Sequence, residues 1–144
     1  MKTIKCVSVT VRSVIDNTEN GLPVGDPERT VIAAVGSLSD EDGVLTVRYA
    51  EEGEDGQRTD VTLVKREGGV ILSRRGSVVV DLVFEEGEEC RTVYSVPPYK
   101  FDMTVNTKKI RSTLCGSGGE LQLIYDMNVG GQEKRVRLHL SVTE

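Results

Sequence analysis

The stretch that decides the fold is Leu121-Gln122-Leu123-Ile124-Tyr125-Asp126-Met127, followed after Gly130-Gly131 by Val136-Arg137-Leu138-His139-Leu140-Ser141-Val142. Apolar residues occupy every second position in both runs, and polar residues fill most of the positions between them. A period of two places alternate side chains on opposite faces of a β-strand, so each run is predicted to be a strand with one buried face. The glycine pair is typical of a hairpin turn and predicts that the two strands are antiparallel.

The same alternation recurs along most of the chain, with Asn-Gly, Asp-Gly and Gly-Gly turn signals between the runs. In the run 77–85 apolar residues occupy both faces, which indicates a strand covered on both sides. Strands are predicted at residues 3–15, 30–39, 43–51, 57–66, 69–75, 77–85, 89–96, 99–114, 119–128 and 132–143. Because this leaves no place for crossover helices, the sequence predicts an all-β antiparallel meander that closes into a barrel or forms a two-sheet sandwich.

The sequence of residues 26–36 is compatible with either a helix or a strand. Asp26-Pro27-Glu28 has the features of a helix N-cap and first turn, and Gly36 is available as a stop. The β-branched residues of 30–35 favour a strand instead, since an extended chain would gain hydrogen bonds from strands on either side. Residues 16–29 are rich in Asn, Gly, Pro and Asp and are predicted to form the longest irregular loop, at the barrel mouth.

Composition narrows the class of protein. The chain has 144 residues, 38% of them hydrophobic and 28% charged, which is enough for one packed core, so 1–144 is predicted to be a single domain. The net charge of −5 disfavours nucleic acid as a partner, and no long apolar run predicts a membrane segment. Residues 1–7 alternate in polarity where a secretory signal would be continuously apolar, so we expect a cytoplasmic protein.

Residues that could carry chemistry are few. Cys6, Cys90 and Cys115 are far apart and are predicted to be reduced thiols without zinc, and His139 is predicted to face outward. Residues 116–119, Gly-Ser-Gly-Gly, are predicted to form a turn, because the residues after them alternate as a strand where a phosphate-binding loop would begin a helix. The sequence therefore predicts no catalytic residues, no metal site and no cofactor, and the chain is expected not to be an enzyme.

Several segments carry a resemblance to a known family. They are Arg75 to Gly87, Tyr94, Val105 to Ile110 and Gly119 to Tyr125, with Tyr49 and Glu51 matching as well. Together they resemble the bacterial YwiB-like family, whose biochemical role is unassigned. The resemblance implies a barrel similar to those of the calycins, the group that includes the lipocalins, and the expected fold is a calycin-like, lipocalin-like antiparallel meander barrel. Where family members tend to carry Thr-Pro-aromatic-Gly, this chain has Val96-Pro97-Pro98-Tyr99.

Four residues are predicted to bind a ligand. Closing a barrel brings the inward faces of its strands together, and Tyr49, Tyr94 and Tyr125 each share a face with the apolar residues of their own strands. These rings would contact an apolar ligand while their hydroxyls orient it, or they would simply fill the core. Arg75, beside the predicted turn at Gly76, would meet a carboxylate of the ligand at the barrel mouth or pair with an acidic turn.

Two hypotheses for function follow. The first is a binding protein for a small apolar or amphipathic ligand held in the barrel. The second is a protein-interaction or homodimer-forming module without a ligand, because Val79 and Val83 on the second face of the run 77–84 require a cover. An open interior lined by the three tyrosines would favour the first hypothesis, and a filled interior with an outer apolar patch would favour the second.

Overall fold

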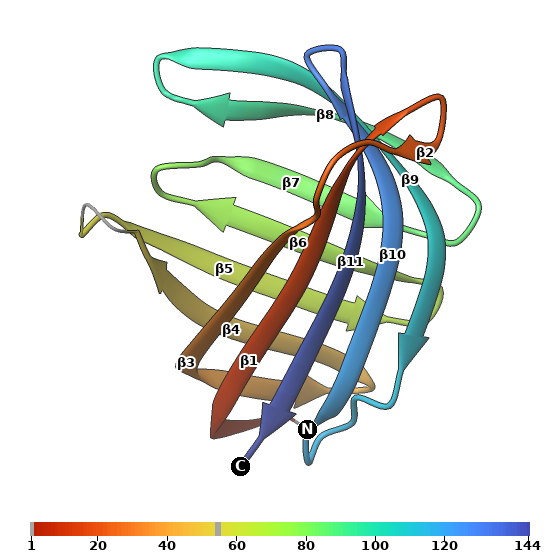
Figure 1. Cartoon of the computed structure of the whole chain (residues 1–144). Coiled ribbons are helices and arrows are strands. Elements are labelled where there is room, and N and C mark those ends of the chain that lie inside the picture. The colour runs from red at the N-terminus through yellow and green to blue at the C-terminus, as the bar shows by residue number, and fades with distance from the viewer. Residues whose placement is uncertain (1, 54–55) are drawn as a thin grey trace.

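The computed structural model describes residues 2–53 and 56–144, which form a single eleven-stranded antiparallel sheet (Figure 1). The strands are β1 (Lys2–Glu19), β2 (Leu22–Pro23), β3 (Glu28–Glu41), β4 (Val44–Glu52), β5 (Arg58–Arg66), β6 (Gly69–Arg75), β7 (Val80–Phe84), β8 (Glu89–Val96), β9 (Tyr99–Ser112), β10 (Gly119–Val129) and β11 (Gln132–Thr143). Their order is β7-β6-β5-β4-β3-β1-β11-β10-β9-β8, and the short β2 pairs with β1. The predicted all-β fold is confirmed.

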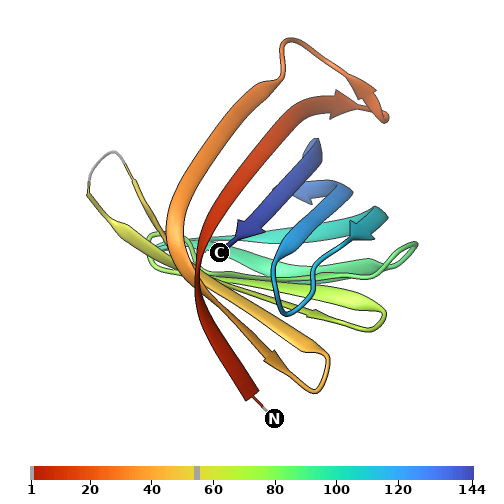
Figure 2. The same cartoon turned by 90° about the horizontal axis from the view of Figure 1, so that it is seen from below.

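The sheet curls until its two end strands meet. Val79, just before β7, and Ser95 of β8 exchange two backbone hydrogen bonds of 2.8 and 3.0 Å. The amide of Gly87 donates to the carbonyl of Thr107 on β9 at 2.9 Å. In Figure 1, β4 to β7 run nearly horizontally and cross β1, β10 and β11, which run nearly vertically. The view from below shows β1 and β3 bending around the interior (Figure 2). The fold is a nearly closed antiparallel barrel.

Each predicted strand has a counterpart in the sheet, with three differences. The helix alternative at 26–36 is wrong, because β3 pairs with β1 along its whole length, for example through Ile32 and Val11. The loop predicted at 16–29 is wrong in part, since β1 continues to Glu19 and β2 follows; β11 supplies ladder partners that keep this part of β1 extended. The strand predicted at 77–85 is shorter, with β7 limited to 80–84.

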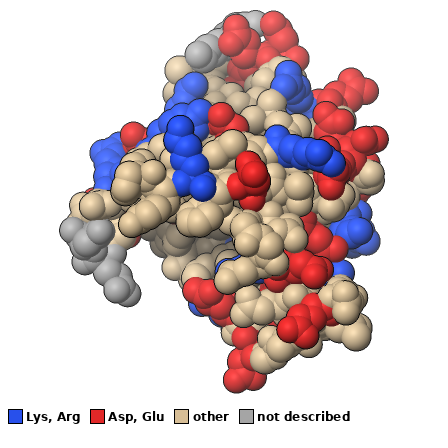
Figure 3. Space-filling model, turned by 90° about the horizontal axis from the view of Figure 1, so that it is seen from above, with Lys and Arg blue, Asp and Glu red and all other residues tan. Residues whose placement is uncertain are grey.

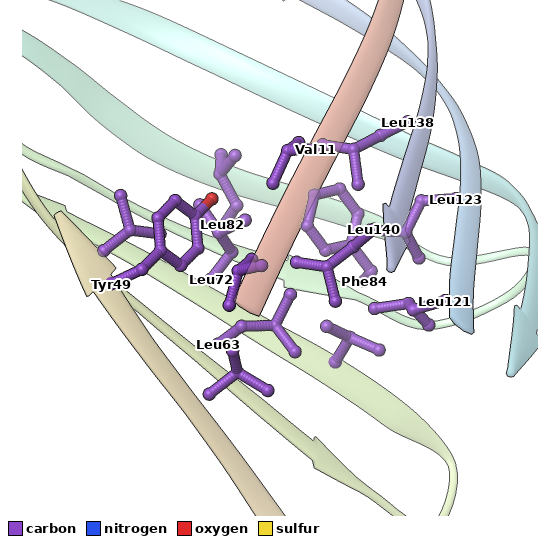
Figure 4. Close-up of a cluster of buried hydrophobic side chains, with 14 of the residues drawn as sticks. Val11, Tyr49, Leu63, Leu72, Leu82, Phe84, Leu121, Leu123, Leu138 and Leu140 are labelled. Atoms are coloured by element: carbon purple, nitrogen blue, oxygen red, sulfur yellow. The ribbon is translucent and has the colours of Figure 1, made fainter. Parts of the chain in front are cut away.

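The centre of the barrel is filled by side chains (Figure 4). Val47, Leu63, Phe84, Leu121 and Leu123 are fully buried, and they come from strands on opposite walls. Alternation along each strand supplies them, as the sequence predicts. This packed centre directs attention to the barrel mouth as the place where a ligand could bind.

Gly36 marks the point where β4 leaves β3. A side chain there would begin 2.2 Å from the carbonyl oxygen of Arg48, so only glycine allows this close approach of the two backbones. β4 pairs with residues 37–41 of β3, whereas residues 28–36 pair, among the described strands, with β1 alone. Within the described residues, the first part of β3 therefore has one unpaired edge, which is visible in Figure 2 as the outer rim of the bent ribbon.

Candidate functional site

The three predicted tyrosines lie in two different environments. Tyr49 on β4 and Tyr125 on β10 point into the barrel and are buried, and the ring of Tyr125 lies with its centroid 4.8 Å from that of Phe84. Tyr94 on β8 is only partly buried, and it contacts the core from the side of the mouth. The structure therefore places two of the rings in the packed interior and one at the opening.

The two interior phenols are held neutral. Burial raises the pKa of Tyr125 to about 12, because the phenolate would lose its hydration. Burial also raises the pKa of Tyr49, and the neighbouring Glu51 carboxylate adds to that rise. A neutral phenol at each position can donate a hydrogen bond but supplies no base near neutral pH.

An ion pair lies near these two phenols. Arg74 Nη1 on β6 donates to Glu51 Oε2 on β4 at 2.6 Å, and the side chains of Arg74 and Glu51 are 27% and 15% exposed. The Arg74 charge lowers the pKa values of both Tyr49 and Tyr125, against the larger effect of burial. Glu51 Oε1 and Thr107 Oγ1 are buried and have no hydrogen-bond partner within the described part of the chain. Arg74 is thus the arginine that faces the tyrosines.

Arg75 lies elsewhere, which corrects its predicted role at the ligand. It donates to both carboxylate oxygens of Asp81 at 2.8 and 2.9 Å, and both side chains are about half exposed on the outer surface. Hydrogen bonds from Ser73 and then from Arg75 lower the pKa of Asp81. Neighbouring residues of a strand face opposite sides, so Arg74 and Arg75 cannot both point inward.

A groove opens at the barrel mouth, between the β8–β9 hairpin and the β10–β11 hairpin. It has a volume of about 390 Å³ and is lined by Tyr94, Phe101, Met103, Met127, Val129, Gly130, Gln132 and Lys134, and we call it the mouth groove. Phe101 lies directly across the ladder from Tyr94 and comes close to the Gly130 turn. Figure 3 looks down on this end, where uncharged surface lies between basic and acidic side chains.

The comparisons with known proteins agree with this architecture. The model of the family described as a domain of unknown function, DUF1934, matches residues 9–140. The chain belongs to this family. It is also 25% identical over 136 residues to the uncharacterized beta-barrel protein YwiB of Bacillus subtilis, a match that covers 94% of this chain and 91% of that protein. The resemblance to the YwiB-like family is confirmed.

A solved structure supports the fold of this DUF1934 protein. The crystal structure of the ywiB protein from Bacillus subtilis superimposes with a TM-score of 0.80 at 21% sequence identity. The match covers 98% of this chain and 94% of that chain. Both are therefore barrels of the same kind.

Sequence reasoning missed most of the mouth groove. Tyr99, Phe101 and Met103 alternate along β9, so a period-two signal was present and would have put them on one inner face. The sequence contained no sign that these residues form a ligand surface, because apolar and polar residues alternate in the same way in the packed and in the open parts of a barrel wall. Only the position of the two hairpins shows that Phe101 is partly open to solvent while Met103 is buried.

The other residues singled out in the sequence of this DUF1934 protein lie outside the mouth groove. Val79 takes part in the bridge that closes the barrel, and Val83 is partly buried. His139 faces outward beside Glu120, at 3.4 Å, and the three cysteines are free. Among the described residues, no cluster of His, Cys, Asp or Glu could hold a metal ion, and no helix is long and apolar enough to cross a membrane.

Proposed function

We propose that this DUF1934 protein binds a small, partly apolar ligand in the mouth groove. The observation that carries the proposal is the groove itself, with aromatic and thioether side chains from β8, β9 and β10 placed around a volume of about 390 Å³. Small-molecule sites commonly occupy roughly 300–1,000 Å³ and are lined mainly by apolar and aromatic side chains. Because the centre of the calycin-like barrel is filled, the proposed site lies at its open mouth and includes Tyr94 but neither Tyr49 nor Tyr125.

Phe101 is the residue on which ligand affinity should depend most. Its side chain is 43% exposed although it points toward the inner face of the barrel, so a ligand could remove more of the ring from water. Burying apolar surface contributes roughly 25 cal/mol per Å², and an aromatic ring adds stacking with an aromatic ligand. Tyr94 and Met127 also line the groove, and the same ligand would pack against them.

Fluorescence titration with N-phenyl-1-naphthylamine, a neutral dye that brightens in apolar sites, tests the proposal. We expect saturable binding of about one dye per chain, and we expect Phe101→Ala to weaken it about 5- to 10-fold because ring contact is lost. Val93→Ala is the matched control: Val93 is 46% exposed on the same hairpin but faces outward. Absence of saturable binding, or equal losses in the two variants, would refute the mouth groove as the site.

A second candidate function, formation of a homodimer, is favoured by the edge of β3 that has no partner strand in the described part of the chain. Residues 30–35 on this edge carry no charge, and Val31 and Val35 are 64% and 74% exposed. Such an edge can add a strand from another chain, and natural proteins usually block it with charges or proline. We propose a second copy of the chain as the partner, because antiparallel pairing about a two-fold axis through Ile32 sets Val31 beside Ala33, a large residue against a small one.

Sedimentation equilibrium tests the homodimer. We expect the wild-type protein to dimerise and Val31→Lys to be monomeric, since a lysine on an edge strand opposes pairing. Val93→Lys introduces the same charge at an exposed valine far along the sheet order and should leave the dimer intact. A wild-type protein that is monomeric at every concentration would exclude this function.

A further inference from the structure

Lys134 brings a positive charge to the inner side of the barrel mouth. It lies two residues before the buried Val136 on β11, so it shares the inward face of that strand, and it lines the mouth groove. Its neighbours across the two ladders are Asn17 on β1 and Met127 on β10, neither of which carries a charge. The side chain is partly buried.

The basic groups next to Lys134 on β11 are paired with carboxylates, whereas no described carboxylate pairs with Lys134. Arg135 donates to Asp126 at 2.7 Å, and Arg137 lies 3.7 Å from Asp16, both on the outer face. In the part of the chain that the structure describes, Lys134 takes part in no ion pair. Glu19 and Glu133 line a neighbouring groove that Lys134 also borders, and among the described residues neither carboxylate forms an ion pair with Lys134.

Among the described residues that line the mouth groove, Lys134 carries the only charged side chain. Tyr94, Phe101, Met103, Met127 and Val129 supply apolar surface, and Gln132 supplies an amide beside Lys134. A ligand that satisfies this arrangement has an apolar body and one anionic group at its end. An ammonium partly withdrawn from water gains most from an ionised acceptor, because charge-assisted hydrogen bonds are stronger than neutral ones.

We propose that the mouth groove selects an amphipathic monoanion, with its carboxylate or equivalent acidic group on Lys134 Nζ and its apolar chain along Phe101, Tyr94 and Met127. This inference rests on the proposed function and adds the chemical class of the ligand. The net charge of the protein is −5, so its overall field repels anions. A measured preference for an anion must therefore come from a local group.

Competition against the neutral dye N-phenyl-1-naphthylamine measures this selectivity with three probes of equal chain length: decanoate, decanol and decyltrimethylammonium. We expect decanoate to bind about 10-fold more tightly than decanol, and the cation to bind most weakly. Lys134→Met keeps the linear apolar stem but removes the charge, and it should make decanoate and decanol bind alike. Lys134→Arg should keep the preference for decanoate, because the charge remains.

Lys100→Met is the matched control. Lys100 lies on the same mouth hairpin with its side chain on the opposite face from Phe101, and the substitution changes the net charge by the same amount. It should leave the preference for decanoate unchanged. Wild-type protein that binds decanoate and decanol equally, or a preference that survives in Lys134→Met, would overturn the inference while the proposed function stands. Failure of all three probes and of the dye itself would overturn both.

Discussion

Replacing Tyr125 by alanine is expected to lower the free energy of unfolding by roughly 3–5 kcal/mol, the usual range for truncating a large buried aromatic side chain. The ring is buried on β10 and lies 4.8 Å from the ring of Phe84 on β7, so it links two strands that are far apart in the sheet order. Its removal leaves a cavity that the rigid barrel wall can close only in part. Urea denaturation followed by far-ultraviolet circular dichroism measures the change.

Tyr125→Phe is the control for this experiment. The ring volume is kept, so we expect a change within about 1 kcal/mol, and dye binding at the mouth groove should be unaffected. A loss of dye binding in Tyr125→Phe would contradict our assignment of Tyr125 to the packed interior. Equal stability of Tyr125→Ala and the wild-type protein would show that this part of the barrel is not packed as described.

Arg74→Ala is expected to lower the free energy of unfolding by about 2–4 kcal/mol at pH 7. The substitution removes the arginine that pairs with the Glu51 carboxylate, which is 15% exposed, and unpairing a buried charge typically costs 3–5 kcal/mol. We place the effect somewhat lower because Arg74 is itself 27% exposed and water can reach part of the site. Urea denaturation of the variant at fixed ionic strength checks the value.

Arg75→Ala is the matched control, one residue along the same strand. Its pair with Asp81 is about half exposed on both sides, and exposed ion pairs are worth roughly 0–1 kcal/mol. We therefore expect Arg75→Ala to stay within about 1 kcal/mol of the wild-type protein. Similar losses in the two variants would contradict the inward position of Arg74 and the outward position of Arg75.

Together these variants distinguish the packed interior of the barrel, which should affect stability, from its mouth, which should affect binding. The interior around Tyr49, Tyr125 and Arg74 is expected to affect stability, because its side chains are packed against each other. Phe101 and Lys134 are expected to affect binding with little effect on stability, because both are partly open to solvent at the mouth. The ligand site lies at the edge of the packed core, so it depends on the core only to hold the two hairpins in place.

Much of the fold could be predicted from the sequence because strand patterning is local. The alternation around Tyr125 and Leu138, with Gly130-Gly131 between them, specifies two strands, their inner faces and their antiparallel direction without reference to the rest of the chain. The inward positions of Tyr49 and Tyr125 follow from the same rule. At residues 26–36 two local signals competed, and the ladder with β1 decided for a strand.

The candidate site depended on contacts that no local pattern contains. Alternation requires Arg74 and Arg75 to face opposite sides, but Val70, Ile71 and Leu72 place apolar residues on both faces of their strand. The contacts with Glu51 on β4 and Asp81 on β7 show which arginine points inward. The bridge from Val79 to Ser95 closes the barrel and joins residues of different hairpins. The mouth groove arises where β8, β9 and β10 extend beyond the packed centre.

By itself, then, the sequence determined the strands, their turns and the alternation of buried and exposed side chains, because each depends on residues a few positions apart. Only the tertiary structure decided which alternating face is packed and which is open, which arginine is paired inside, and which edge of β3 has no partner strand among the described residues. Those features depend on where the sheet curves and closes, and curvature is set by the packing of side chains from opposite walls, which lie far apart in the chain.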